Sequence, residues 1–423
     1  MTGSPPVGKR PLVAVAYGRR SVPLFTLREA AAPVADLLWL VDSADPAGAP
    51  NARLLGKLGP VVDIAGRSGL DIAAALRPHR PDGLVTFFDR GMVRLAEIAE
   101  ALGLRFHRPA VAARLVDKQL QREAFRAAGL DVPTCWAVPA DRDVVALAQE
   151  AVFPAVLKPR AGSGSWHTFR VHDGAELEQL CGPSGPLDPD DDMVLEEYIP
   201  DGWSHSRPQF ADYVSVESIV DAGHISHVAV TGRFSLAETF RETGFFIPSD
   251  LAAGDEAAVL ELATTALLAL GVDVGCTHTE IKMTGDGPRV IEINGRLGGG
   301  IPDLLAMAAG LPLLELALRL AVGEPVRIPG PVACDRIGYR FLVQPPVTAR
   351  RVTGISGLDR LAAVPGVADI SVHHPPGDSI DWRRGSQSFV FAAFGTVSGY
   401  DELRGVDTFI REQVEIGYED QDS

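Results

Sequence analysis

The sequence predicts an α/β and α+β protein with an N-terminal doubly wound parallel-sheet domain, a central α+β part and a C-terminal α+β region. Its 423 residues exceed what one hydrophobic core usually holds, so roughly two to four folding units are expected. Short apolar runs alternate with helical patterns in the first part of the chain, which is typical of a parallel sheet with crossover helices. Further along, pairs of strand patterns are joined by glycine-rich turns, which indicates hairpins.

The N-terminal part has strand patterns at residues 12–16, 37–41, 61–64 and 84–88, and residues 92–102 have apolar side chains at helical spacing. This order predicts a doubly wound domain with about three or four strands. The first strand-to-helix turn lacks a GxGxxG pattern, so nothing in this domain indicates a dinucleotide.

The central part begins with an amphipathic pattern at residues 115–128, which predicts one continuous helix ended by Gly129. A second helical pattern at residues 255–270 is closed by Gly271, and the tail has a helical pattern at residues 406–414. Strands are predicted at residues 154–159, 168–171, 193–199, 213–220, 225–230, 279–283, 289–294, 337–343 and 388–394.

Acidic residues outnumber basic ones by 55 to 39, which gives a net charge of −16. This surplus argues against nucleic acid or an anionic membrane as a partner, so any phosphate-bearing ligand has to be held by a local site. The four cysteines lie far apart without a CxxC pair, and no apolar run has the length of a signal peptide or a membrane span. We therefore expect a cytoplasmic protein.

Two acidic residues mark a candidate metal site in the stretch HTEIKMTGDGPRVIEINGRLGGG, residues 278–300. A hairpin turning at Gly-Asp-Gly-Pro would place Glu280 beside Glu292, and Asn294 would share a strand face with Glu292. Carboxylate and amide oxygens are donors that Mg²⁺ accepts, with nucleotide phosphates and water completing the octahedron. The alternative is a solvated hairpin with ordinary exposed acids.

A lysine followed by a glycine and serine loop marks a candidate phosphate site. Lys158 ends an apolar strand pattern and precedes Arg160-Ala161-Gly162-Ser163-Gly164-Ser165. Its ammonium and the N–H groups of the loop could approach phosphate oxygens together. No Gly-Lys-Ser/Thr follows, so the loop is not a Walker A motif, and a plain hairpin turn is the alternative.

Taken in order, these motifs resemble the ATP-grasp superfamily of carboxylate-amine ligases over residues 115–323. Asp117-Lys118 looks like the helix with the first nucleotide lysine, and residues 195–199 (LEEYI) are similar to the hinge strand that meets the adenine. The resemblance implies an ATP-grasp fold with a Rossmann-like pre-ATP-grasp domain at residues 1–112, an N-lobe at 113–192, a C-lobe at 193–325 and a cap at 326–423. It implies ATP binding by Lys118, Lys158, Gly162, Ser163, Gly164, Ser165, Glu196, Glu197 and Ile199, metal ligation by Glu280, Glu292 and Asn294, and a catalytic Arg296 that steadies the reacting acyl group.

Within the superfamily, residues 212–219 (DYVSVESI) and 277–282 (THTEIK) look closest to bacterial L-amino acid ligases. The resemblance implies that Glu242, in Arg241-Glu242-Thr243, is a substrate-side acid near an amino group; the alternative is an exposed loop glutamate. It also implies ATP and Mg²⁺ as cofactors, with Mn²⁺ as an alternative ion, small-molecule carboxylate and amine substrates, and a homodimer.

Several residues depart from the family pattern or lie near the motifs without an assigned role. Residues 245–247 (FFI) predict an apolar substrate wall. We expect structural or packing roles for His167, His278 and Cys276. Surface positions are expected for Trp203, His205 and Arg207 in the loop 202–210, and for His373, His374, Asp381 and Trp382 in the tail.

The function predicted from this resemblance is ATP-dependent activation of a carboxylate, such as that of an amino acid, as an acyl phosphate, followed by amide formation. One alternative is a carboxylase or purine-pathway ligase that uses bicarbonate or formate. The other is a nucleotide-binding protein without catalysis, which need not keep Glu280, Glu292, Asn294 and Arg296 together.

Overall fold

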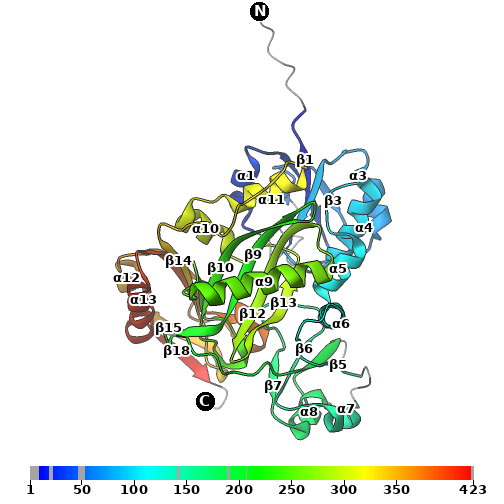
Figure 1. Cartoon of the computed structure of the whole chain (residues 1–423). Helices are drawn as coiled ribbons and strands as arrows, with labels where there is room; N and C mark the ends of the chain where they lie inside the picture. The colour runs from blue at the N-terminus through cyan, green and yellow to red at the C-terminus, as the bar shows by residue number, and fades with distance from the viewer. Residues whose placement is uncertain are drawn as a thin grey trace, which may run out of the picture.

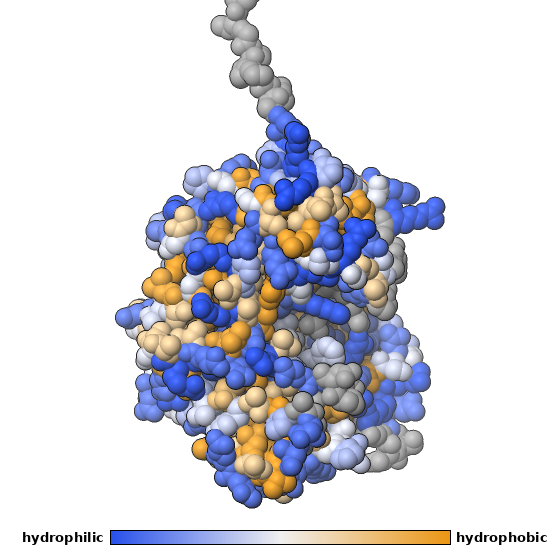
Figure 2. Space-filling model, turned by 90° about the vertical axis from the view of Figure 1, so that its right-hand side faces the viewer, coloured by the Kyte–Doolittle hydropathy of each residue, from blue (hydrophilic) through white to orange (hydrophobic). Residues whose placement is uncertain are grey.

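The computed structural model of the chain describes residues 9–18, 22–45, 53–139, 141, 143–187, 191–205 and 207–420. The N-terminal segment up to residue 8 and Ser206 of the loop 202–210 lie outside the described residues. Hydrophilic residues cover much of the face shown in Figure 2, and hydrophobic ones are interspersed among them.

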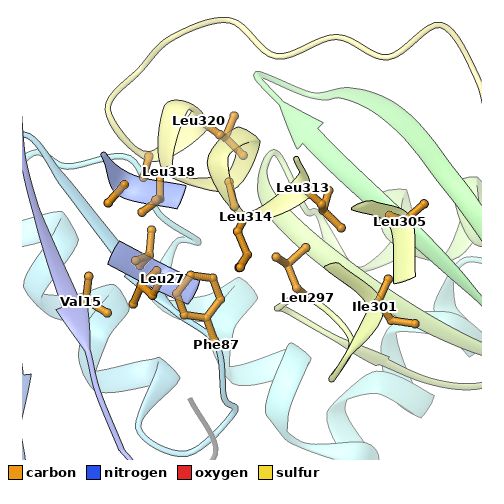
Figure 3. Packing of buried hydrophobic residues seen from close by; sticks show 14 of the residues in the cluster. Val15, Leu27, Phe87, Leu297, Ile301, Leu305, Leu313, Leu314, Leu318 and Leu320 are labelled. Atoms are coloured by element: carbon orange, nitrogen blue, oxygen red, sulfur yellow. The ribbon is translucent and has the colours of Figure 1, made fainter. Parts of the chain in front are cut away.

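The N-terminal part contains a parallel sheet with the strand order β3-β2-β1-β4, which confirms the predicted doubly wound domain (Figure 1). Apolar side chains on one face pack against α3 and α4, while α1 and α11 pack against the other face. Figure 3 shows Leu314 and Leu318 of α11 near Leu27 of α1 and Phe87. The elements are β1 (Leu12–Ala16), α1 (Leu24–Ala31), β2 (Asp36–Val41), β3 (Val61–Asp63), α3 (Gly69–Leu76), β4 (Gly83–Thr86), α4 (Met92–Leu102) and α11 (Leu313–Ala321).

The helix predicted at residues 115–128 is wrong in one respect, because the structure has two helices that meet at Asp117. Asp117 has extended backbone angles and caps the second helix, accepting hydrogen bonds from the N–H groups of Gln119 and Leu120. An aspartate N-cap ends one helix and begins another, although the apolar pattern runs through it. The helices are α5 (Pro109–Val116) and α6 (Lys118–Ala127).

A small lobe follows, built on an antiparallel sheet with the order β5-β8-β6-β7. Two short helices close its apolar core, and the glycine loop connects β6 to β7. The elements are β5 (Cys135–Ala137), α7 (Val145–Glu150), β6 (Ala155–Pro159), β7 (Phe169–Val171), α8 (Gly174–Cys181) and β8 (Met193–Glu197).

The largest sheet has eight antiparallel strands in the order β13-β12-β9-β10-β11-β14-β17-β16. Helix α9 packs across its first half (Figure 1). The predicted limit at residue 325 therefore falls between strands of one continuous sheet, and the domain limits themselves stay predictions. The elements are β9 (Phe210–Asp221), β10 (His224–Phe234), η1 (Glu238–Phe240), β11 (Gly244–Ile247), α9 (Ala253–Leu270), β12 (Val274–Thr284), β13 (Gly287–Asn294), α10 (Ile301–Ala309), β14 (Ile337–Val343), β16 (Val367–Val372) and β17 (Phe391–Val397).

The C-terminal region adds a separate apolar core against β14 and β17, covered by α13. The strand predicted at residues 388–394 starts only at Phe391, because helical turns of η2 occupy the positions just before it. Its remaining elements are β15 (Ala349–Ser356), α12 (Leu358–Ala362), η2 (Trp382–Ser388), α13 (Tyr400–Gln413) and β18 (Glu415–Asp420).

Among the described residues, no single helix is long and apolar enough to cross a membrane. The consecutive helices α10 and α11 meet this test only as a pair, bent by 117° at their junction, and both are largely buried in the fold.

Candidate functional site

A cavity of about 2260 Å³ lies where the N-terminal sheet, the small lobe, the large sheet and the C-terminal region meet. Typical small-ligand pockets have about 300–1,000 Å³, so this one has room for more than one ligand. The predicted site residues that line it are Lys118, Lys158, Gly162, Ser163, Gly164, Ser165, Glu196, Glu197, Ile199, Glu242, Glu280, Glu292 and Arg296.

Lys118 is the first residue of α6 and connects the glycine loop to the acidic hairpin. Its ammonium donates to the carbonyl oxygen of Gly162 at 2.9 Å and lies 3.1 Å from Glu292 Oε2. The second carboxylate oxygen of the N-cap Asp117 pairs with Arg160 at 2.8 Å, which fixes the start of the helix to the end of β6. Lys118 is buried in the folded chain, so its charge faces the cavity with little competition from solvent.

Lys158 is held by the buried carboxylate of Glu196, which the family resemblance assigned to ATP binding. Glu196 Oε2 lies 2.6 Å from Lys158 Nζ and 3.0 Å from Arg122 Nη2. Burial alone would raise the pKa of Glu196, but the two cations outweigh it and lower the pKa. The side chain of Glu196 therefore orients Lys158 toward the cavity. Arg122 was missed, although its place one helical turn after Lys118 on an amphipathic helix could have indicated it.

The hairpin prediction is confirmed in its register, since Glu280 lies directly opposite Glu292 and His278 opposite Asn294. Burial would raise the pKa of Glu292, but the charges of Lys118 and Lys158 lower it. Opposed side chains on neighbouring strands lie about 5 Å apart at Cβ, a spacing at which two carboxylates can share one ion. Asn294 does not line the cavity; its amide lies behind Glu292 and donates to Glu292 Oε1 at 3.3 Å.

These donors fit a hard cation such as Mg²⁺, because two carboxylates face a cavity whose remaining walls are rich in lysine and N–H groups. No group of three or more His, Cys, Asp or Glu side chains that could hold a metal occurs among the described residues. Phosphate oxygens and water would therefore supply most of the ligands, as is usual for Mg²⁺ bound with a nucleotide.

His278 lines the cavity next to Glu280 and belongs to a buried polar cluster. Its Nδ1 lies 2.8 Å from Glu217 Oε1, and its Nε2 lies 3.4 Å from Glu280 Oε1 and 3.2 Å from Arg233 Nη2. Burial would lower the pKa of the ring, but Glu217 outweighs burial and raises it to about 9. Glu217 was missed; the polar residues Ser215 and Glu217, two apart in an otherwise apolar strand, were the available indication.

Arg296 is held from the N-terminal domain by Asp89, which the sequence analysis did not single out. Arg296 Nη2 and Nε lie 3.0 and 3.1 Å from Asp89 Oδ2, and both side chains are 13% exposed. Arg296 Nη1 also donates to the carbonyl oxygen of Leu297 at 3.0 Å. Asp89 lies in the loop after β4, at the carboxyl edge of the parallel sheet, where ligands of such sheets usually bind.

Glu242 is half-buried and paired with a buried arginine, so the exposed-loop alternative is wrong. Its Oε1 lies 2.5 Å from Nη1 of the buried Arg233, whose Nη2 donates to Ser215 Oγ at 2.9 Å. Arg241 points away from the cavity and donates to the carbonyl oxygen of Pro345. Glu242 lines the cavity beside Arg233 and Phe245.

The C-terminal region closes the glycine loop. The Ser386 N–H donates to the Gly164 carbonyl oxygen at 2.9 Å, and the His167 N–H donates to the Arg383 carbonyl oxygen at 3.3 Å. Trp382 packs against Phe169 with ring centroids 6.3 Å apart, so the surface position expected for this tail segment is wrong. A Cβ at Gly385 would lie 2.2 Å from Gly164 O, which shows how tightly the two backbones meet.

The remaining sequence expectations have mixed outcomes. Phe245 lines the cavity, but Phe246 and Ile247 do not, because Phe246 packs into the C-terminal core. Trp203, His205 and His374 are half-buried and line the cavity, against the expected surface positions, whereas His373 lines the cavity and is exposed, as expected. The surroundings of three further side chains are consistent with structural roles. His167 Nδ1 lies 2.9 Å from Asp191, and Arg207 pairs with Asp250 and Asp401. Burial raises the pKa of the Cys276 thiol to about 12.

Comparison with known protein families finds no family model that matches this chain. Among curated proteins, it is 29% identical over 269 residues to the uncharacterized protein y4rH of Sinorhizobium fredii, covering 62% of this chain and 53% of that protein. It is 29% identical to carnosine synthase 1 of Mus musculus, covering 59% of this chain and 31% of the relative. It is 25% identical to the L-arginine-specific L-amino acid ligase of Bacillus subtilis, covering 64% of each. The matches thus span between about a third and two thirds of these relatives.

Among solved structures, the L-amino acid ligase from Bacillus licheniformis aligns over 97% of this chain and 99% of its own, with a TM-score of 0.77 at 20% identity. The N5-carboxyaminoimidazole ribonucleotide synthetase from Thermotoga maritima aligns over 97% of this chain and 100% of its own, with a TM-score of 0.68 at 16% identity. The fold expected from the sequence resemblance is thereby confirmed.

Proposed function

We propose that this chain, which has the ATP-grasp fold, is an ATP-dependent carboxylate-amine ligase acting on amino acids or closely related acids. In the first step, a carboxylate oxygen bonds to the γ-phosphorus of ATP while the bond to the β,γ-bridging oxygen breaks, giving an acyl phosphate and ADP. In the second step, an amine nitrogen attacks the acyl carbon and loses a proton, and the acyl–oxygen bond breaks to release phosphate.

The residues of the small lobe and of α6 bind the nucleotide in this proposal. Lys118 and Lys158 neutralise phosphate oxygens, and the N–H groups of residues 162–165 approach the same phosphates under the closed loop. Glu197 and Ile199 line the part of the cavity next to the hinge strand, where the adenine is expected. The proposal gives Glu196 a positioning role through Lys158.

Glu280 and Glu292 would hold Mg²⁺, with Asn294 orienting Glu292 from behind. The ion, when bound with the nucleotide, would neutralise charge that develops on the transferred phosphoryl group. Arg296 and Glu242 both line the cavity, and the proposal has Arg296 steady the reacting acyl group and Glu242 offer its carboxylate to a substrate ammonium.

The observation that supports this function most strongly is the convergence on one cavity of Lys118, Lys158, Glu280, Glu292 and Arg296, which come from three separate parts of the chain. A nucleotide-binding protein without catalysis has no need of Arg296, which contacts no predicted nucleotide-binding residue and is held by Asp89 instead.

The experiment that tests the function measures ADP release from ATP and Mg²⁺ over single amino acids and amino acid pairs, with hydroxylamine added to trap the activated acid as a hydroxamate. Release that depends on an amino acid and an amine, with a hydroxamate of one acid, supports the ligase. Dependence on bicarbonate supports the carboxylase alternative, and no release under any condition refutes an enzymatic function.

A further inference from the structure

The C-terminal region contributes a wall of the cavity that the proposed chemistry does not use. It consists of side chains from β14, from the end of β16 and from the segment around η2: Arg340, Leu342, Ser371, His373, His374, Arg384, Gln387 and Phe389. The wall contains two arginines whose charges are permanent, so it is suited to an anionic group rather than an ammonium.

Strand alternation directs Arg340 into the cavity. Tyr339 and Phe341 pack into the C-terminal core, so Arg340 and Leu342 face the opposite side of β14, where both line the cavity. Arg340 lies directly opposite Phe245 on the neighbouring strand. A Cβ on Gly300 would lie 2.9 Å from Arg340 Nη1, which places the guanidinium at the start of α10, a few residues after Arg296.

The half-buried Arg340 differs from several other cations that line the cavity in having no carboxylate partner among the described residues. Lys118, Lys158, Arg122, Arg233 and Arg296 each pair with an acid at 3.1 Å or less. Among the described residues, no ion pair or hydrogen bond of the Arg340 side chain occurs, and its Nε is buried without a partner. A half-buried guanidinium whose Nε is enclosed without a partner is costly unless a ligand completes it.

Among the described residues, Asp303 is the acid that acts on Arg340, and it does not complete the guanidinium. Asp303 lies in the first turn of α10 and interacts with Arg340 through space, but the two form no ion pair. Burial raises the pKa of Asp303, although Arg340 acts in the opposite direction.

We propose that Arg340 binds the free carboxylate of the amine substrate, so that the attacking amine is itself an amino acid or a similar amino-carboxylate. This inference rests on the proposed function. The reacting carboxylate has to lie at Arg296 and the Glu280–Glu292 pair, so a second anion site a short distance away belongs to the other substrate. A guanidinium binds a carboxylate through two parallel hydrogen bonds, which would fix the amine relative to the acyl carbon. Arg384 lines the same wall and adds positive potential.

The test compares three nucleophiles with the acid that the wild-type protein activates: a free L-amino acid, its carboxamide, and hydroxylamine. The variants are Arg340→Gln and Arg340→Lys, with Arg336→Gln as the matched control. Arg336 is an exposed arginine just before β14 and lies outside the cavity wall. The wild type should have a KM for the amino acid about 10- to 100-fold below that for the carboxamide. R340Q should abolish this preference, R340K should keep part of it, and R336Q should keep all of it.

Each of the following outcomes overturns either the assignment of Arg340 or the proposed function. An unchanged preference in R340Q overturns the assignment of Arg340 while leaving the ligase intact. A loss of hydroxamate formation as large as the loss of peptide formation overturns it too, because hydroxylamine has no carboxylate to bind. If R340Q does not fold, R340K with the wild-type preference overturns it. No hydroxamate from the wild type with any acid refutes the proposed function, and this inference falls with it.

Discussion

Asp89 should control the rate of acyl transfer although it is more than two hundred positions from Arg296 in the sequence. Two N–H donors of Arg296 converge on Asp89 Oδ2 at 3.0 and 3.1 Å in a place where both side chains are 13% exposed. Asp89→Asn keeps an oxygen acceptor but loses the charge, whereas Asp89→Ala loses both. Charge-assisted hydrogen bonds contribute about 1.5–3 kcal/mol, so D89N should lower kcat about tenfold and D89A about a hundredfold.

The assay is steady-state amide formation at saturating ATP, with the ATP KM and the free energy of unfolding measured for each variant. Both variants should leave the ATP KM within a few fold of the wild-type value, because Asp89 contacts no predicted nucleotide-binding residue. Unfolding free energy should fall by about 2 kcal/mol or more, since an unpaired buried guanidinium remains. Asp36→Asn, which removes the exposed pair with Arg10, is the matched control and should change neither quantity appreciably. The reasoning is refuted if D89A keeps the wild-type kcat, or if kcat falls no further in D89A than in D89N while stability falls in both.

Three further outcomes are expected. Arg296→Ala should lower kcat about a hundredfold with little effect on ATP binding, measured as ATP KM, because it removes the donor to which the proposed function assigns the acyl group. Burial would raise the pKa of Glu196, but two cations lower it below the ordinary value of 4.5. The ionised carboxylate therefore stabilises the fold above about that pH, and this stabilisation is lost as the pH falls through the folded-state pKa. Chemical unfolding at several acidic pH values should show a weaker pH dependence of stability for Glu196→Gln than for the wild type. Gly385→Ala should raise the ATP KM and expose the glycine loop to protease, because its Cβ would lie 2.2 Å from Gly164 O. The control Gly377→Ala is also at positive φ but has open space around it, so it should change neither the ATP KM nor the protease sensitivity.

Local patterns predicted the parts of the site that depend on neighbouring positions in the sequence. Glu280 and Glu292 lie in one hairpin, and a short turn fixes their register, so their juxtaposition follows from strand alternation alone. The lysine and the glycine loop at 158–165 are likewise contiguous. The helix break at Asp117 was also readable, because aspartate is a preferred N-cap residue, but the apolar pattern on both sides concealed it.

Long-range pairs could not be predicted in the same way. Arg122 meets Glu196 across 74 positions and Arg296 meets Asp89 across 207, and a charged residue in one segment does not indicate which distant acid it will meet. The packing of helices could not be predicted either, because α11 follows the hairpin of Glu280 and Glu292 in sequence but packs against the N-terminal sheet. Strand β14 has an alternating pattern, but nothing in that pattern shows that it continues the sheet begun by β13 and β12.

The C-terminal region, which was expected to be a cap, also contacts the glycine loop and lines the cavity. Ser386 binds the glycine loop through its N–H and receives the Glu242 N–H on its hydroxyl oxygen at 3.0 Å. The side-chain amide of Gln344 donates to the carbonyl oxygens of both Glu242 and Ser386, at 2.7 and 3.0 Å. The glycine loop and the cavity-lining Glu242 are therefore joined through one hydrogen-bonded network. Opening the glycine loop has to break or displace a contact of that network, so movement of this loop and the placement of Glu242 are coupled.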